Sequence, residues 1–432
     1  MPYKPGNRLP GERASKLGHL DVIKSELVNR LIDEFEHDEG EAEVEPLVWE
    51  EFGEEATPLR LIFAVDGSMQ PIVSTTPPYK ELSFVKTSLI RLDQVAISRV
   101  DQKAPHPLQL RDILADSAIY HATVFPMRAV SIPGLSNYDA VRRIIFESMQ
   151  DESIDAQSFK TLKWLAYEKW TGKPTQSPNF ECPHCRKDVG GLPPDANTGP
   201  CPHCKGELYL TDMLGFHLEM GEDAVPQTVA TAYMLVHETL FLFTGIRHFW
   251  EAKKQKVLEE CLFLKDGPLT LRSQYSKLVI PIRRFFQYSQ EHGITIHMAG
   301  QEKTGAFVDH LEKIGKHAPP KTVFLPSNDY IRREVQSAPE RAEPYGIRTN
   351  YGNKLFVKTD PHHKMVISIP TGEYKDSKEL TDLIGINRIL ATLPTIKSHR
   401  HEGALLPIQL ANGVASLSTY PSAAVLKMFA GI

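Results

Sequence analysis

The sequence predicts an α/β fold into which a four-cysteine zinc ribbon is inserted. Apolar runs of strand length alternate along the chain with longer stretches whose apolar residues recur every three or four positions, which is the spacing of a helix. Two Cys-x-x-Cys pairs stand close together in a stretch rich in proline and glycine. A chain of 432 residues with 41% hydrophobic residues can form two to three domains, or one enlarged domain with insertions.

Composition narrows the class of protein. Four of the five cysteines fall in the two pairs, which favours a metal site over a disulfide framework. We find no apolar run of about eighteen residues, and residues 1–13 lack the apolar region of a signal peptide. We therefore expect a cytoplasmic protein that does not enter a membrane.

The charge is distributed unevenly. Residues 33–55 contain twelve Asp or Glu and no Lys or Arg, and removing them leaves 49 basic against 42 acidic residues. A mildly basic body with a separate acidic segment is compatible with nucleic-acid binding, but also with a solvated linker beside an ordinary surface. Charge alone does not choose between the two.

An amphipathic helix is predicted over residues 15–36. Its apolar residues are spaced by three and four positions, and its end enters the acidic segment. Such a helix either docks on a partner protein or packs back on its own domain. The apolar positions are Leu17, Leu20, Ile23, Leu27, Leu31 and Phe35.

Two apolar runs lead into an aspartate and a glycine. Residues 61–65 form a buried-strand pattern that ends in Asp66 and Gly67, and residues 261–265 precede Asp266 in the same way. Asp-Gly is an ordinary turn, so each run alone is weak. The pair favours two carboxylates held at one edge of a sheet, where they would bind a divalent metal.

The remaining elements follow from the same patterns. Pro77 and Pro78 mark a turn, and residues 171–195 read as a loop. Helices are predicted over 138–150, 156–170, 274–292, 382–393 and 410–417, and strands over 82–97, 294–298, 355–358 and 365–369, with a further strand starting at 323.

The cysteine pairs are the most specific motif. The pair Cys182 and Cys185 is separated by fifteen residues from the pair Cys201 and Cys204. Two knuckles at this spacing bring four thiolates to tetrahedral distance, which suits Zn²⁺ and leaves no open position for catalysis. We expect a structural zinc site, with the histidines inside the knuckles as bystanders and Cys261 as a buried core residue.

The stretch 224–246 is predicted to be a buried helix with Glu238 as its only charged residue. A buried carboxylate is costly unless it is paired or holds a metal. It would therefore form a salt bridge, with Arg247 or Arg284, or face Asp66 and Asp266 as a metal ligand. A His-Glu-x-x-His zinc protease is excluded because the position of the second histidine holds a phenylalanine.

Lys303 follows the strand at 294–298, among small residues. There it would meet a phosphate or the hydroxide of a metal site, or it would be a solvated loop lysine.

The order of these motifs resembles the NurA nucleases. The resemblance covers about residues 15–130 and 215–430. It implies a ribonuclease-H-like mixed sheet flanked by helices and related to the Argonaute PIWI domain, DNA cleavage with manganese, a HerA hexameric ATPase as partner, and a homodimer. It rests on Ala-Val-Asp-Gly-Ser at 64–68, Leu-Lys-Asp-Gly-Pro-Leu at 264–269 after a helical glutamate, Gly-Gln-Glu-Lys-Thr at 300–304, Asn-Asp-Tyr-Ile at 328–331, and Leu-Pro-Ile-Gln-Leu-Ala-Asn at 406–412.

The resemblance also implies a division of the chain. Residues 1–55 are the N-terminal helix and acidic linker, 56–175 the first part of the nuclease core, 176–212 the zinc ribbon insertion, and 213–432 the second part of the core.

Carried over to this chain, the resemblance makes Asp66, Glu238 and Asp266 the metal ligands. Glu251 and Glu147 are alternatives to Glu238, which is preferred because its surroundings are apolar. The bound ions would be Mn²⁺ or Mg²⁺, since oxygen ligands suit these better than zinc.

Two further residues follow from the motifs. Lys303 would stabilise the pentavalent phosphorus. Asn412 stands where the family often has a histidine; its carbonyl oxygen can bind a metal but cannot act as a base, and His401 is a possible substitute.

The expected function is metal-dependent DNA hydrolysis by a two-metal mechanism, with a HerA-like ATPase, in DNA end processing or antiphage defence. Two alternatives stay open. One is an inactive DNA-binding scaffold that recruits the ATPase, and the other is a different ribonuclease-H-like enzyme such as a transposase or an RNA-cleaving nuclease.

Overall fold

The chain divides into two units, residues 1–48 and 49–432, which are described separately. The structure is a computed structural model. It describes residues 22–34, 47–52, 56–95, 118–221, 227–338, 343–376, 378–398, 403–417 and 421–431.

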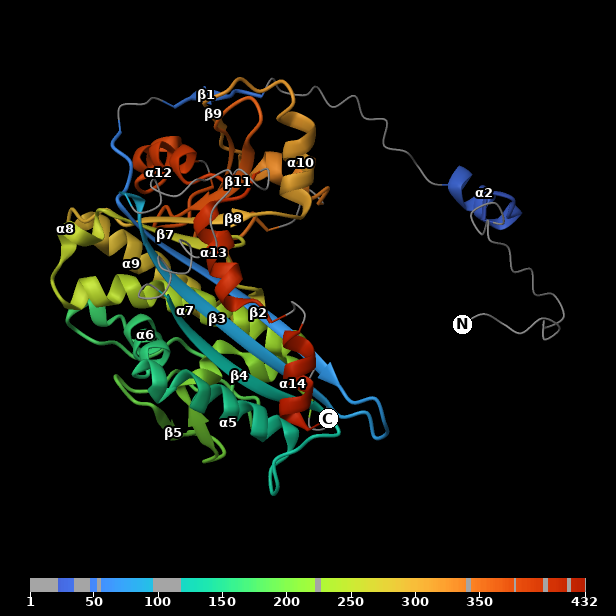
Figure 1. The fold of residues 1–432 in the computed structure, drawn as a ribbon. Helices are drawn as coiled ribbons and strands as arrows, with labels where there is room; N and C mark the ends of the chain where they lie inside the picture. The colour runs from blue at the N-terminus through green and yellow to red at the C-terminus, as the bar shows by residue number, and fades with distance from the viewer. Residues whose placement is uncertain are drawn as a thin grey trace. The chain divides into compact units, whose positions relative to one another are not determined.

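The larger unit is built on a mixed nine-stranded sheet of order β1-β9-β10-β11-β8-β7-β2-β3-β4 (Figure 1). β7 pairs in parallel with both β2 and β8, and the other neighbours are antiparallel. The strands are β1 (Glu50–Glu51), β2 (Leu61–Val73), β3 (Glu81–Asp93), β4 (Ala118–Arg128), β7 (Cys261–Asp266), β8 (His297–Glu302), β9 (Thr322–Phe324), β10 (Asn353–Lys358) and β11 (Lys364–Ile369).

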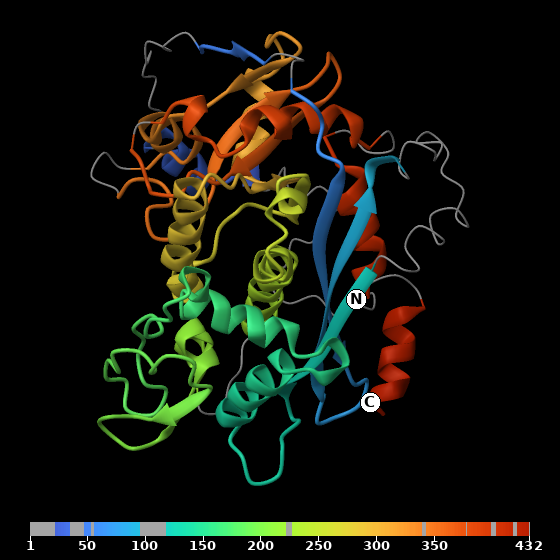
Figure 2. The ribbon, with the colours of Figure 1, turned by 90° about the vertical axis from the view of Figure 1, so that its left-hand side faces the viewer.

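Helices cover both faces of this sheet. In Figure 2 the long strands β2, β3 and β4 are seen with the C-terminal helices on one side and the green helices of the middle of the chain on the other. The helices of this unit are α5 (Asn137–Met149), α6 (Gln157–Ala166), α7 (Gln227–Glu251), α8 (Gln255–Leu258), α9 (Val279–Glu291), α10 (Ala306–Ile314), α11 (Asn328–Tyr330), α12 (Ile386–Thr392), α13 (Leu406–Ala415) and α14 (Ser422–Ala430).

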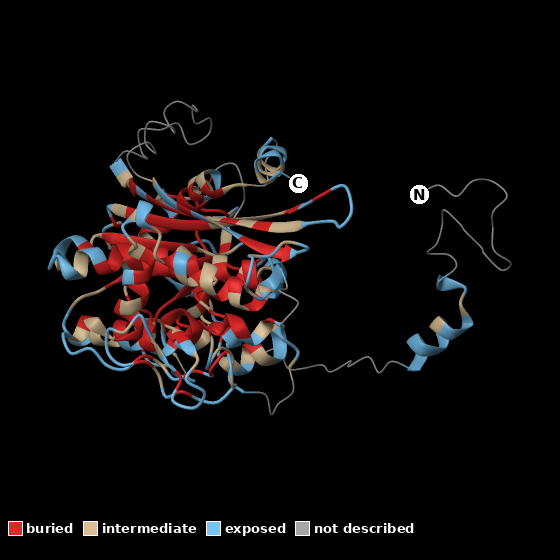
Figure 3. Cartoon of the chain, turned by 90° about the horizontal axis from the view of Figure 1, so that it is seen from below, coloured by how far each residue is buried: buried red, intermediate tan, exposed pale blue. Residues whose placement is uncertain are grey.

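The pleat of the central strands divides the core in two. Phe63 and Val65 of β2 point into a cluster with α7 and α9, whereas Ile62 and Ala64 point into a second cluster with α12 and α13. Both clusters are fully covered, as the red interior of Figure 3 shows. A strand buried on both faces reads as a continuous apolar run, which is why residues 61–65 are recognisable in the sequence.

The helix α7 is the central helix on one face, where it contacts β2, β3 and β7. By length and composition alone this helix could cross a membrane. In the protein, however, 83% of its most apolar stretch of 18 residues is buried. Its apolar character on every side is therefore explained by burial between the sheet and α6.

The prediction of an α/β fold with an inserted four-cysteine cluster is confirmed, and its sheet is mixed and flanked by helices as expected. The prediction that the first strand ends at Asp66 is wrong, because β2 continues to Val73 in an uninterrupted hairpin with β3. Glu50 and Glu51, placed in the acidic linker by the sequence, form the edge strand β1. Three longer elements, β4, α10 and α14, were not predicted, nor were the short elements β1, β5, β6, α8 and α11.

The cysteine-rich insertion is part of the larger unit. Its two short strands, β5 (Thr198–Pro200) and β6 (Glu207–Tyr209), pair with each other only. Cys182, Cys201 and Leu208 nevertheless lie in the same hydrophobic cluster as α5, α6 and α7. The insertion is thus packed into the core of the protein.

The N-terminal unit contributes one described helix, α2 (Glu26–Glu34). None of its residues is buried, and the apolar side chains of Ile23, Leu27 and Leu31 are 62%, 57% and 39% exposed. Leu17, Leu20 and Phe35 lie outside the described residues. Among the described residues of this unit, none buries the predicted apolar stripe.

Candidate active site

Two aspartates meet where β7 ends beside β2. The parallel register pairs Val65 with Lys265, so the next residues, Asp66 and Asp266, stand side by side on neighbouring strands. Both continue the pattern of positions that face α12 and α13. After Asp266 the backbone turns at Gly267, whose φ of +82° is a conformation that favours glycine.

Glu238 reaches the same place from the opposite face of the sheet. It lies on α7 and is 2% exposed. Its carboxylate fills the space above Gly67, where an added Cβ would come within 2.6 Å of Glu238 Oε1. Gly67 therefore serves not as a turn residue, as the sequence suggested, but as a gap in the sheet that admits the glutamate.

Two of the three carboxylates, those of Glu238 and Asp266, are each paired with a lysine. Lys265 Nζ lies 3.0 Å from Glu238 Oε2, and Lys303 Nζ lies 2.9 Å from Asp266 Oδ1. Lys303 was singled out from the sequence, whereas Lys265 was not. A charged residue inside a buried apolar strand was the available signal.

The salt-bridge partners proposed for Glu238 from the sequence are wrong. Arg247 pairs with Glu251 and Arg284 pairs with Glu168, at 2.7 and 2.8 Å. The reason is geometric, since Arg247 points toward α6, where it donates to Thr161, and away from the sheet.

The pKa of Asp66 is strongly shifted by its surroundings. Burial, followed by the charges of Asp266 and Glu238, raises its pKa from 3.8 to about 7, against the opposing effects of Asn412 and Lys303. Its Oδ1 accepts the Gly67 N–H at 2.7 Å, while its Oδ2 is buried without a hydrogen-bond partner. A buried carboxylate oxygen without a partner, in the field of two other carboxylates, fits a divalent-cation ligand.

Burial also raises the pKa of Glu238, and the Lys265 ammonium opposes this effect. Burial would by itself lower the pKa of Lys265, but the charge of Glu238 raises it above its ordinary value. Glu238 thus favours the charged form of Lys265, and Lys265 offsets part of the cost of burying the Glu238 carboxylate.

Asn412 is brought to the site by α13. That helix is fixed on the sheet by Ser88, whose hydroxyl donates to the Ala411 carbonyl at 2.8 Å, and by Lys86, which donates to the Val414 carbonyl at 2.6 Å. The Asn412 side chain lies near enough to Asp66 to lower the pKa of its carboxyl by a hydrogen bond. His401 lies outside the described residues.

The two alternatives to Glu238 stand elsewhere. Glu147 is 60% exposed and pairs with Arg143, and Glu251 is 49% exposed at the far end of α7. The charge of Glu238, in contrast, is among the main causes of the raised pKa of Asp66.

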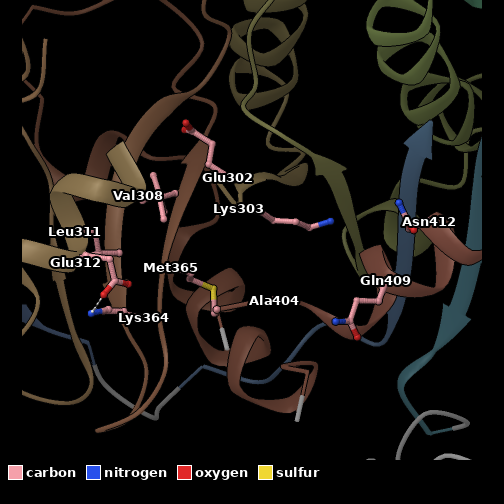
Figure 4. A pocket seen from close by; sticks show the side chains of 12 residues that line it. Glu302, Lys303, Val308, Leu311, Glu312, Lys364, Met365, Ala404, Gln409 and Asn412 are labelled. Carbon is pink, nitrogen blue, oxygen red and sulfur yellow. Dashed lines mark hydrogen bonds and ion pairs between the residues drawn. The ribbon is translucent and has the colours of Figure 1, made fainter. Parts of the chain in front are cut away.

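A pocket of about 660 Å³ opens beside the acidic residues. Figure 4 shows Lys303 extending toward the side of the pocket where Asn412 and Gln409 lie. At the opposite side of the pocket, Lys364 and Glu312 form an ion pair at 2.7 Å. Apolar side chains, including Met365, also line the pocket. The three carboxylates do not line this pocket, but Lys303 and Asn412 do, and they interact with Asp266 and Asp66, so the pocket lies next to the acidic site.

The four cysteines form a second, separate cluster. The sulfur atoms of Cys182 and Cys204 are 3.7 Å apart, and those of Cys185 and Cys201 are 3.8 Å apart. A tetrahedral site with bonds of about 2.3 Å requires sulfur separations of about 3.8 Å. All four lie within 4.8 Å of one another, and among the described residues they are the one group of three or more Cys, His, Asp or Glu whose ligand atoms are that close.

The knuckle histidines are not part of this cluster. His184 and His203 hydrogen-bond through Nε2 to the carbonyls of Glu207 and Asp188, at 3.0 and 2.9 Å. Each also places its backbone N–H 3.4 Å from the sulfur of the first cysteine of its knuckle. The cluster can bind a metal ion through its four thiolates, and Cys261 is a buried core residue, as predicted.

No protein-family model and no curated protein sequence matches this chain. Among solved structures, a crystal structure of NurA aligns over 96% of this chain and 97% of that chain, with 11% sequence identity and a TM-score of 0.32.

The raised pKa of Asp66 predicts a pH-dependent effect of its removal. Between its unfolded value near 3.8 and its folded value of about 7, the folded chain binds the proton more tightly, so stability falls as pH rises through this window. In metal-free buffer we expect Asp66→Asn to unfold at higher denaturant than the wild type, with a gain of up to about 4 kcal/mol above pH 7 that shrinks toward pH 4. A gain that is the same at pH 5 and pH 8 would contradict this.

Proposed function

We propose that this protein is a metal-dependent DNA nuclease that hydrolyses phosphodiester bonds by a two-metal mechanism. The observation that carries the proposal is the placement of three carboxylates in the interior of the sheet. The parallel register sets Asp66 of β2 beside Asp266 of β7, and Glu238 of α7 lies near enough for its charge to raise the pKa of Asp66. Such a concentration of carboxylate, with one buried oxygen unpartnered, has little structural benefit without a cation.

Each residue has a definite part in this reaction. Asp66, Glu238 and Asp266 would hold Mn²⁺ or Mg²⁺, and Asn412 would add a neutral oxygen ligand beside Asp66. The bound ions would supply a water made nucleophilic near neutral pH and relieve the charge on the leaving oxygen. Lys303, whose side chain is 33% exposed, would exchange Asp266 for a phosphate oxygen and stabilise the charge that develops around phosphorus.

The direct test is cleavage by the purified chain. We expect Mn²⁺ to support degradation of DNA and excess EDTA to abolish it. A panel of single-stranded DNA, duplex DNA and RNA separates a deoxyribonuclease from an RNA-cleaving or transposase-like enzyme. Metal-dependent cleavage of RNA alone would overturn the choice of substrate, and the absence of any cleavage would favour the alternative below.

The alternative is a catalytically weak or inactive DNA-binding scaffold. One observation favours it: Glu238 and Asp266 are each already neutralised by a lysine, at 3.0 and 2.9 Å. In that case the chain would bind DNA with the same affinity in EDTA and in Mn²⁺, and would not cut it.

We also propose that α2 docks on a HerA-like hexameric ATPase, with the nuclease as a homodimer that presents two such helices. The supporting observation is that Leu27 and Leu31 are exposed on a helix with no buried residue. A helix this short is marginal alone, so an apolar stripe on it favours a partner groove.

Deleting residues 1–36 should abolish co-purification with the ATPase while the remaining chain stays folded and keeps its nuclease activity. Leu27→Asp combined with Leu31→Asp should have the same effect. If the double variant still co-purifies while the truncated chain becomes insoluble, the helix belongs to the core and the docking proposal is wrong.

A further inference from the structure

Lys265 occupies a position that packing alone would give to an apolar residue. It lies on the face of β7 that packs against α7, and the preceding residues on that face, Cys261 and Phe263, are buried in the apolar cluster. Lys265 is 1% exposed. Burying an ammonium is unfavourable unless it is paired and hydrogen-bonded, so its presence requires an explanation from its contacts.

Both hydrogen bonds of the Lys265 ammonium go to residues of the acidic site. Lys265 Nζ donates to Glu238 Oε2 at 3.0 Å and to the backbone carbonyl of Asp266 at 2.9 Å. One side chain therefore fixes both the helix-borne carboxylate and the end of the strand that carries the second aspartate. The remaining oxygen of Glu238, Oε1, is the one that lies above Gly67.

Lys303 and Lys265 differ in how far they are exposed to solvent and so in whether they can change their ion-pair partner. The Lys303 side chain is 33% exposed at the rim, so it can leave Asp266 when a phosphate arrives. Lys265 is enclosed between β7 and α7 and cannot exchange its partner without opening the core. Three carboxylates are thus balanced by one movable and one permanent positive charge.

We propose that Lys265 is a built-in cation that permanently neutralises Glu238, so that the free chain binds one divalent ion at the acidic site and accepts the second only together with the DNA phosphate. This inference rests on the proposed function. Three carboxylates and two ammonium groups leave a single negative charge, which one divalent ion already reverses. A second ion then needs the negative charge that the substrate brings. Lys265 acts through Glu238 and is a positioning residue.

The test is a titration of the full, zinc-loaded chain with Mn²⁺ at pH 8 without DNA, in which free Mn²⁺ is measured by electron paramagnetic resonance. The double variant Asp66→Asn/Asp266→Asn measures the Mn²⁺ that other acidic residues bind, which is the background. Above this background we expect one strong site in the wild type. Lys265→Met should gain a second site or bind the first about 10-fold more tightly or better, because a fixed positive charge has been removed.

Two variants complete the design. Lys265→Arg keeps the charge and should bind one ion like the wild type. Lys265→Gln keeps a donor to Glu238 without the charge, and it carries the same expectation as Lys265→Met if the latter does not fold. Two strong sites in the wild type, or unchanged Mn²⁺ binding in both neutral variants, would overturn the inference. If no protein binds Mn²⁺ above the background, the proposed metal site itself fails, which is a separate result.

Discussion

Replacing any one of the three carboxylates should abolish DNA cleavage while leaving the fold intact. For Asp66→Asn, Glu238→Gln and Asp266→Asn we expect the cleavage rate to fall by at least about 10³-fold, equivalent to about 4 kcal/mol of lost transition-state stabilisation. Each change removes one metal ligand and nearly preserves the volume of the side chain. Glu238→Gln also removes the counter-charge of the buried Lys265, which should lower the free energy of unfolding by about 3–5 kcal/mol. Initial rates on a labelled duplex in Mn²⁺, with circular dichroism to verify folding, would measure this effect.

The chain supplies matched controls for this experiment. Glu251→Gln and Glu147→Gln make the same chemical change at glutamates whose side chains are 49% and 60% exposed, and both should cleave at the wild-type rate. If Glu238→Gln cuts DNA normally, Glu238 is not a ligand and these two glutamates become the candidates. If Asp66→Asn also cuts normally, the acidic site is not the catalytic centre.

The second large effect concerns the four-cysteine cluster. The chain purified without added metal should contain one equivalent of zinc, because the four sulfurs already stand at tetrahedral distances. We expect Cys182→Ser or Cys201→Ser to lose the metal and to destabilise the whole protein by about 3–5 kcal/mol, since both residues are fully buried in the main hydrophobic cluster. Elemental analysis and denaturant unfolding give the two readouts.

Cys261→Ser is the matched control for the cysteine variants. Cys261 is equally buried, and its thiol donates to the Val257 carbonyl at 3.0 Å, which a serine hydroxyl can also do. This variant should keep a full equivalent of zinc. Less than about half an equivalent in the wild type, together with cysteine variants as stable as the wild type, would contradict a structural zinc site.

The sequence by itself determined the elements whose patterns are local. The buried strands around Asp66 and Asp266, the hairpin of β10 and β11, the apolar helix α7 and the cysteine knuckles all follow from short-range spacing, because burial on both faces, alternation and metal ligation each impose a residue pattern over a few positions. The identity of three acidic candidates followed from the same patterns with the help of the family resemblance.

Only the tertiary structure decided how these residues meet. The parallel register of β2 and β7 sets Asp66 beside Asp266, and the missing side chain of Gly67 lets Glu238 enter from the other face. The ion pair of Lys265 with Glu238 replaced the arginine partners expected from sequence. These contacts join residues up to about two hundred positions apart in the chain. No local pattern records them, because the electrostatic and steric forces between such residues depend on distance in space and not on separation along the sequence.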